Sequence, residues 1–155
     1  MRPELVAWAG GAVNRRRQKK LSVRLVRAAS VGDTATVDVL LRAGACPATA
    51  DADGTTPLYA ASVHGASDTV RRLLAAGAPP DTESGHGAEG TPLCGAACWG
   101  HTDTVRELLA HGADPNLRED HGTGRPPLYW AEHGPHPETA ALLLAAGAHP
   151  LDGTA

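Results

Sequence analysis

The sequence predicts an all-α protein built as a stack of four short helix–turn–helix units. Three observations support this prediction: one motif recurs four times, its copies lie 33 to 35 residues apart, and the composition favours small apolar side chains. Phe is absent, only 3% of the 155 residues are aromatic, and the 42% apolar content is mostly Ala, Leu and Val. Such side chains suit closely packed helices, whereas a sandwich or barrel needs period-two strands rich in β-branched and aromatic residues.

Three copies of the motif are nearly regular. They open with Thr-Pro-Leu or Pro-Pro-Leu and close with Leu-Leu-Ala-x-Gly-Ala, and a more degenerate copy precedes them at 23–45. The opening leucines Leu25, Leu58, Leu93 and Leu128 are separated by 33, 35 and 35 residues. Self-similarity at this period is typical of a stack in which each unit buries its apolar face against the next.

Each unit carries start and stop signals for two short helices. Thr56 and Thr91 are predicted N-caps, and the prolines after them fit the first helical turn, where a missing N–H costs nothing. Gly65 and Gly77 are predicted to end the two helices of one unit by adopting a positive φ. Between them, the apolar side chains of 70–74 recur at helical spacing and predict a buried face.

The motif divides the chain into three parts. Residues 1–22 are predicted to form a basic N-terminal capping segment, 23–150 the repeat domain and 151–155 a short tail. The four repeats are placed at about 23–55, 56–90, 91–125 and 126–150. The loops at 82–90 and 117–125 are each two residues longer than their counterpart in the first unit.

These residues resemble the ankyrin repeat family, whose mark is Thr-Pro-Leu-His-x-Ala at a period near 33 residues. The resemblance covers about residues 23–150. It implies a solenoid with β-turn finger loops, and a protein-interaction module whose elongated concave groove binds a partner of unknown identity. The family's His is replaced here by Val26, Tyr59, Cys94 and Tyr129, which suggests a less rigid stack.

The resemblance also implies where a partner would make contact. The family's variable positions are the two residues after the small Ala pair, together with the loop tips. Here they correspond on the helices to Ser30, Val31, Val63, His64, Cys98, Trp99, His133 and Gly134, and in the loops to Asp51, Asp53, Glu83, His86, Glu89, Arg118, Glu119, Asp120, His121 and Arg125.

Trp99 is the sharpest of these candidates, because a Trp facing a groove is a typical energetic anchor of an interface. An alternative is that Trp99 covers neighbouring Ala side chains and stabilises the stack, and the sequence leaves both interpretations open. The acidic loop tips favour a partner with basic residues, although exposed acidic loops are usually just solvated. Trp130 replaces a Leu-like residue and is expected in the core.

Charge is unevenly distributed along the chain. Residues 1–27 carry eight basic side chains against one acidic (+7), and 28–155 carry six against sixteen (−10), which gives the net charge of −3. A basic cluster consists of Arg15, Arg16, Arg17, Lys19 and Lys20. It is interpreted as the polar end of a capping helix, as a nuclear-import signal, or as a module that binds nucleic acid or an anionic membrane. The capping interpretation is favoured because no aromatic residue in the cluster could stack on bases.

The last repeat lacks the polar outer residues of its predecessors. Where the second and third repeats have Arg71-Arg72 and Arg106-Glu107, the fourth has Ala141-Leu142. Because a terminal repeat should be more polar than its neighbours, we expect the tail, a partner or a second copy in a homodimer to cover this end.

Enzymatic and metal chemistry find little support. Cys94, Cys98 and His101 lie close in sequence, but zinc needs four ligands, or three and an open position, and the repeat pattern accounts for Cys94 and His101. No G-x-S-x-G elbow, H-E-x-x-H pair or phosphate-binding loop is present. We therefore expect a non-enzymatic protein without cofactor or metal. Three cysteines do not make a disulfide framework, which favours a cytoplasmic setting.

Overall fold

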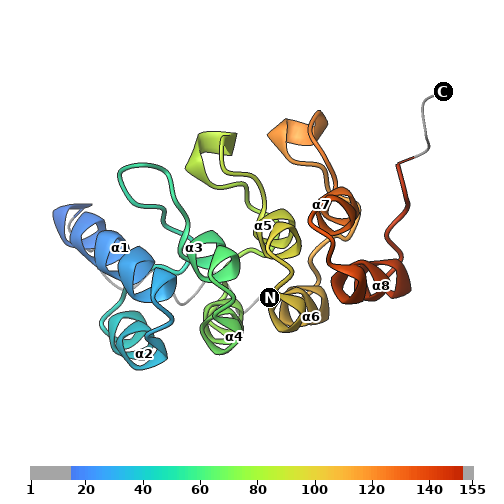
Figure 1. Cartoon of the computed structure of the whole chain (residues 1–155). Helices are drawn as coiled ribbons and strands as arrows, with labels where there is room; N and C mark the ends of the chain where they lie inside the picture. The colour runs from blue at the N-terminus through green and yellow to red at the C-terminus, as the bar shows by residue number, and fades with distance from the viewer. Residues whose placement is uncertain (1–14, 152–155) are drawn as a thin grey trace, which may run out of the picture.

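The computed structural model describes residues 15–151 and confirms an all-helical solenoid of four repeats. The helix pairs are α1 (Arg15–Ser30) with α2 (Thr34–Arg42), α3 (Pro57–Val63) with α4 (Ser67–Ala75), α5 (Pro92–Cys98) with α6 (Thr102–Ala110), and α7 (Pro127–His133) with α8 (Pro137–Ala145). Two 3₁₀ turns, η2 (Gly85–Gly87) and η3 (Asp120–Gly122), lie in the loops, and this part of the chain has no β-strand. Figure 1 shows an inner row of α1, α3, α5 and α7 over an outer row of α2, α4, α6 and α8.

The helices begin and end where the sequence places their caps. Thr56 Oγ1 accepts from the N–H of Tyr59, and Thr91 Oγ1 accepts from Cys94, each over 3.2 Å. Gly65 follows the end of α3 with φ +69°, and Gly32, Gly44, Gly77, Gly100, Gly112 and Gly147 are likewise left-handed, whereas Gly134 after α7 has φ −83°. A left-handed residue lets the chain reverse after only seven or nine residues, so the helices stay short and stack in two rows.

The core is a line of repeated leucines and valines along the stack. Leu25, Leu58, Leu93 and Leu128 of the inner helices are each at most 2% exposed. Each buried leucine contributes about 2 kcal/mol of hydrophobic free energy. Ala residues between them bring the inner helices close enough for α1, α3, α5 and α7 to pack side by side.

Threonine hydroxyls in the outer row link some neighbouring repeats but not all of them. Thr34 Oγ1 lies 2.9 Å from Thr69 Oγ1, and Thr102 Oγ1 lies 2.8 Å from Thr139 Oγ1. Thr104 occupies the same place in α6 as Thr69 does in α4, yet its buried hydroxyl has no hydrogen-bond partner within residues 15–151. The junction between the second and third repeats therefore lacks one link.

The basic cluster and the first repeat form one continuous helix, so the predicted division between residues 22 and 23 falls inside α1. Arg17 Nη2 donates to the Ala43 carbonyl over 3.2 Å, and Gln18 Nε2 donates to the Gly44 carbonyl over 2.7 Å. These bonds satisfy carbonyls at the end of α2, which a helix end otherwise leaves unpaired. The remaining parts of the capping segment and the tail, residues 1–14 and 152–155, lie outside the described residues.

At the other end of the described range, α7 is the last helix of the inner row. Ala29, Ser62 and Ala97 are fully buried, whereas Glu132 at the equivalent place in α7 is exposed. Within residues 15–151 α7 packs against α5 and α8, and the Glu132 carboxylate on its remaining side faces solvent. Leu144 of α8 remains 46% exposed, and the expected contact of this end with a second copy stays a prediction.

Candidate functional site

Three loops project from the inner row and form a line of fingers. Finger 1 is Asp51–Thr55, finger 2 is Ser84–Gly90 and finger 3 is Glu119–Arg125. Each is closed at its base by a backbone hydrogen bond from its first residue to its last, over 3.0, 2.9 and 3.3 Å. Fingers 2 and 3 are each two residues longer than finger 1 and contain the turns η2 and η3. In these turns His86 (φ 56°) and His121 (φ 53°) adopt left-handed conformations.

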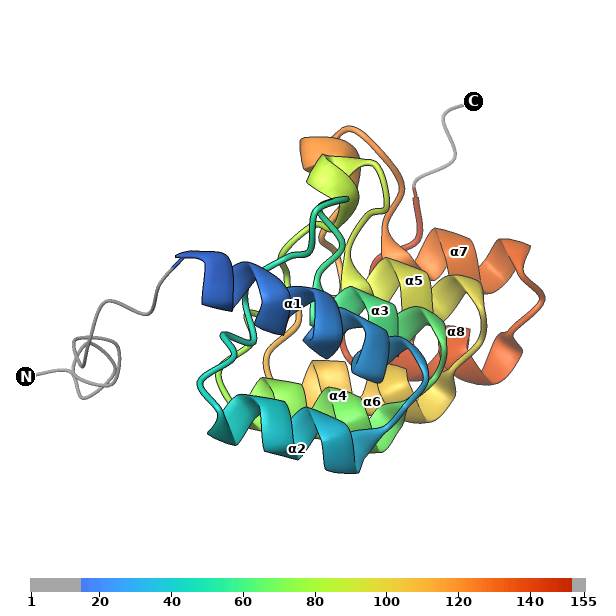
Figure 2. The same ribbon diagram turned by 90° about the vertical axis from the view of Figure 1, so that its left-hand side faces the viewer.

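The fingers lean on one another and make a continuous wall, which Figure 2 shows above the inner helices. The Gly85 N–H donates to the Gly54 carbonyl over 2.8 Å, and a Cβ on Gly54 would lie only 2.7 Å from the ring of His86. His121 packs over Gly87 in the same way. Both histidines were predicted as partner contacts, and both are exposed while supporting the neighbouring finger.

A hollow of about 300 Å³ lies in the angle between the fingers and helices α3, α5 and α7, and we call it the central hollow. Tyr59, Cys98 and Trp99 line its helical side, and Glu89 and Glu119 line its finger side. Trp99 is the C-cap residue of α5 and is 65% exposed. The sequence-predicted residues Cys98, Trp99, Glu89 and Asp120 therefore meet around one space.

The two glutamates of the central hollow are held in place by neutral donors. The Glu119 carboxylate accepts from Trp130 Nε1 over 2.9 Å, and the Glu89 carboxylate accepts from Thr55 Oγ1 over 3.0 Å and from Ser84 Oγ over 2.6 Å. Burial raises the pKa of Glu119, and the nearby Asp120 and Glu83 charges raise it further. Across residues 15–151, no Lys or Arg forms an ion pair with either glutamate.

The thiols beside the hollow are held in their protonated form. Burial raises the pKa of Cys94 to about 12, and burial followed by the Glu119 charge raises the pKa of Cys98. His101 points elsewhere, with its Nε2 3.1 Å from the Val63 carbonyl oxygen. Within the described range, no three His, Cys, Asp or Glu side chains gather in a way that could hold a metal ion.

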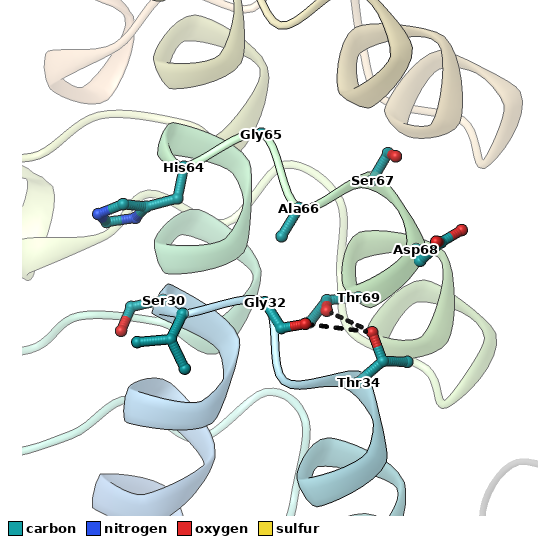
Figure 3. Close-up of a pocket in the computed structure, with 10 residues that line it drawn as sticks. Ser30, Gly32, Thr34, His64, Gly65, Ala66, Ser67, Asp68 and Thr69 are labelled. Atoms are coloured by element: carbon teal, nitrogen blue, oxygen red, sulfur yellow. Dashed lines mark hydrogen bonds between the residues drawn. The ribbon is translucent and has the colours of Figure 1, made fainter.

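A second, more open hollow of about 500 Å³ lies between the C-terminal ends of α1 and α3 (Figure 3). We call it the end hollow. At the two following junctions this space is filled by a histidine, since His101 bonds to the Val63 carbonyl and His136 Nε2 lies 3.0 Å from the Cys98 carbonyl oxygen. Ala66 stands in the corresponding position, and its short side chain leaves the space open.

His64 and Val63 do not line the central hollow with Trp99. His64 lines the end hollow, where its Nδ1 lies 2.8 Å from the Ala60 carbonyl oxygen of its own helix. Val63 is half-buried, and its side chain packs so close to Gly95 that a Cβ there would lie 2.7 Å away. Val63 therefore contributes mainly to helix packing.

The predicted contacts around α7 form a separate group. The Arg125 guanidinium lies 4.5 Å above the Tyr129 ring, and His133 stacks on the same ring with a centroid separation of 3.8 Å. Arg118 Nε donates to the Gly124 carbonyl over 2.9 Å, within the loop.

The remaining loop residues mainly support the fingers. Glu83 accepts from the His121 N–H over 2.9 Å and lies 3.0 Å from its ring Nδ1, which makes an ion pair when the histidine is protonated. Asp53 sits at the tip of finger 1, where its N–H donates to Asp51 Oδ1 over 3.0 Å.

The basic cluster lies on α1, at the N-terminal end of the stack. Arg15, Arg16, Lys19 and Lys20 are exposed, as are Arg24 and Arg27 further along the helix, which contains no acidic residue. Arg17 differs from the others because it holds the end of α2. No helix in the range 15–151 is long and apolar enough to cross a membrane.

Two aromatic residues of the central hollow, Tyr59 and Trp130, were not predicted as site residues. Tyr59 stands where the family's His is expected, and this substitution was a usable signal that the position differs. Trp130 was expected in the core, but it is only half-buried and its indole N–H reaches Glu119 eleven residues away, which the repeat pattern does not reveal.

Comparison with known proteins agrees with this architecture. A family model described as ankyrin repeats (3 copies) matches residues 78–153, and one described as ankyrin repeat matches residues 53–84. No curated protein matches the chain. The family matches begin after α2, so the first helix pair is identified by its degenerate motif and by its place in the stack. With matches over 53–153 and four stacked helix pairs, the chain belongs to the ankyrin repeat family.

Proposed function

We propose that this ankyrin repeat chain is a non-catalytic interaction module that binds a partner protein at the central hollow and along the fingers, with Trp99 as the anchor. Ankyrin repeats are general protein-interaction modules, and the location of the contact is our proposal. The observation that carries it is the 65% exposure of Trp99 beside a concave space. A cytoplasmic setting remains a prediction.

The exposure of Trp99 weighs against a purely structural role. An indole that served to cover Ala side chains would be largely buried, whereas Trp99 is 65% exposed. An exposed indole in a concave surface loses unfavourable contact with water when a partner covers it, and truncation of such an anchor costs 2 kcal/mol or more, roughly a thirtyfold loss of affinity.

Affinity capture from native cell extract tests the proposal with three baits. The baits are the wild type, Trp99→Ala and a matched surface control, Arg106→Ala, which alters an exposed side chain of α6 in the outer row. We expect one set of proteins to bind the wild type and the control and to be lost with Trp99→Ala. Equal capture by all three baits would contradict a role for Trp99.

A second candidate function is anion binding by α1, and the observation that favours it is the exposed basic side of this helix. Lys19, Lys20 and Arg24 surround Val23, which is 46% exposed, and no acidic residue of α1 neutralises them. Binding through such charges would weaken steeply with salt, because it depends on the release of counterions. Titration of duplex DNA and of anionic vesicles at two salt concentrations, with Lys19→Gln/Lys20→Gln as the variant, tests it. Salt-independent or undetectable binding would argue against it.

A further inference from the structure

We propose that the partner inserts an arginine side chain into the central hollow, where the Trp99 ring and the carboxylates of Glu89 and Glu119 receive its guanidinium. The inference rests on the proposed function and names the chemistry that the hollow selects. The partner is accordingly a protein with an exposed basic segment.

The first argument comes from the next repeat of the same chain. There Arg125 closes finger 3 and its guanidinium lies 4.5 Å above the ring of Tyr129. Thirty-five residues earlier, the equivalent positions hold Gly90 and Cys94, and both line the central hollow. Two small residues thus stand where the last repeat places a cation and an aromatic ring, and the Glu119 carboxylate lies against Gly90 instead of a side chain from that position. An arginine from outside would restore the arrangement that the last repeat builds internally.

The second argument is the charge around this space. Glu89 and Glu119 meet only neutral donors, and no described Lys or Arg forms an ion pair with them. Burial already disfavours the charged form of Glu119 and raises its pKa. An apolar or acidic partner would remove more water from these carboxylates without replacing it, which costs free energy. A guanidinium offsets that cost because it brings both opposite charge and hydrogen-bond donors.

The third argument selects arginine over lysine. Trp99 offers an exposed indole, the aromatic ring on which cations bind best, and Tyr59 lines the same space. A guanidinium can stack on a ring with its face while its edge donates to a carboxylate, whereas an ammonium is a compact and strongly hydrated charge. A hollow that combines an aromatic wall with carboxylates therefore fits arginine better.

The experiment starts with a displayed library of random twelve-residue peptides selected on the full chain. The strongest peptide is then synthesised in three forms that carry arginine, lysine or citrulline at the enriched position, because citrulline keeps the shape and removes the charge. Binding is measured to the wild type, Glu119→Gln and Glu138→Gln. Glutamine at 119 keeps an oxygen for the Trp130 N–H, and Glu138 is an exposed control in the outer row.

We expect the arginine peptide to bind the wild type about tenfold or more tightly than the citrulline peptide, with lysine between them. Glu119→Gln should abolish most of this preference, and Glu138→Gln should retain it. Peptides that require Trp99 but bind equally well with citrulline would overturn the inference and leave the proposed function standing. Selection of no peptide, or of peptides that bind Trp99→Ala as tightly as the wild type, would overturn both the inference and the proposed function.

A second copy of the chain is the competing occupant, since α1 is rich in arginine and lysine. Analytical ultracentrifugation without peptide decides this point. A dimer that dissociates with salt and is lost in Glu119→Gln would assign the hollow to the basic helix of another copy and would overturn the proposal. An oligomeric state that changes neither with salt nor in Glu119→Gln is the result we expect.

Discussion

The two buried threonines of the outer row, Thr69 in α4 and Thr104 in α6, offer a matched test of the forces that hold neighbouring repeats together. Each is 1% exposed and each occupies the third position of its helix. Thr69 shares a hydrogen bond of 2.9 Å with Thr34, whereas the Thr104 hydroxyl has no partner among residues 15–151. Replacement by valine keeps the shape of either side chain and removes the hydroxyl alone.

The two replacements should therefore act in opposite directions. Thr69→Val removes a hydrogen bond and should lower the free energy of unfolding by about 1 kcal/mol. Thr104→Val removes a buried hydroxyl that no bond compensates, and should raise the free energy of unfolding by about 1 kcal/mol. The separation of about 2 kcal/mol corresponds to roughly 1 M in the urea midpoint.

Urea unfolding followed by far-ultraviolet circular dichroism measures this separation. The slope of the transition serves as a control, because an unchanged slope shows that both variants unfold as the wild type does. If Thr104→Val destabilises the chain as much as Thr69→Val, the unpaired hydroxyl is not a defect, and the account of the repeat junctions is wrong.

Three further predictions concern the packing of the repeats and one buried thiol. Ser67→Thr should supply Thr104 with the hydroxyl partner it lacks and add about 1 kcal/mol of stability in urea unfolding; the gain should disappear in a Thr104→Val background. Ala66→His should fill the end hollow and hydrogen-bond to the Ser30 carbonyl, and should therefore raise the midpoint of thermal unfolding. A midpoint no higher than that of Ala66→Leu would contradict this hydrogen bond. Because the pKa of Cys94 rises from 9.0 to about 12 on folding, the unfolded thiol loses its proton first as pH rises. The contribution of Cys94 to the free energy of unfolding should therefore be complete below pH 9 and be lost between pH 9 and about 12, by at most about 1.4 kcal/mol per pH unit. In urea unfolding at these pH values, the free energy of unfolding of Cys94→Ala should fall less steeply with pH than that of the wild type.

Features that depend on neighbouring residues were predictable from the sequence. The N-caps Thr56 and Thr91 and the left-handed glycines act within one turn of a helix, so a single copy of the motif contains all the information they need. The repeated leucines set the period and with it the stack. The continuous helix of Arg15–Ser30 was missed as a unit, although this segment contains no Gly or Pro to interrupt it.

Features that depend on contacts between repeats were not predictable in the same way. The hydrogen bond between His101 and the Val63 carbonyl joins residues 38 positions apart, and the sequence near either residue does not predict it. The central hollow likewise brings together residues of three repeats, from Tyr59 to Trp130. The sequence predicted a groove-facing position for Trp99 and left its role open, whereas the carboxylates that share the hollow with it follow from how the fingers lean.

The most direct test of the central claim is a nitrogen–proton correlation NMR titration of the full chain with the strongest selected peptide. The account predicts that the Trp99 indole signal and the backbone amides of fingers 2 and 3 shift together, with the amides of α4 and α6 unchanged. Shifts confined to α1, or to the outer helices, would place the binding surface elsewhere and contradict the assignment of the central hollow.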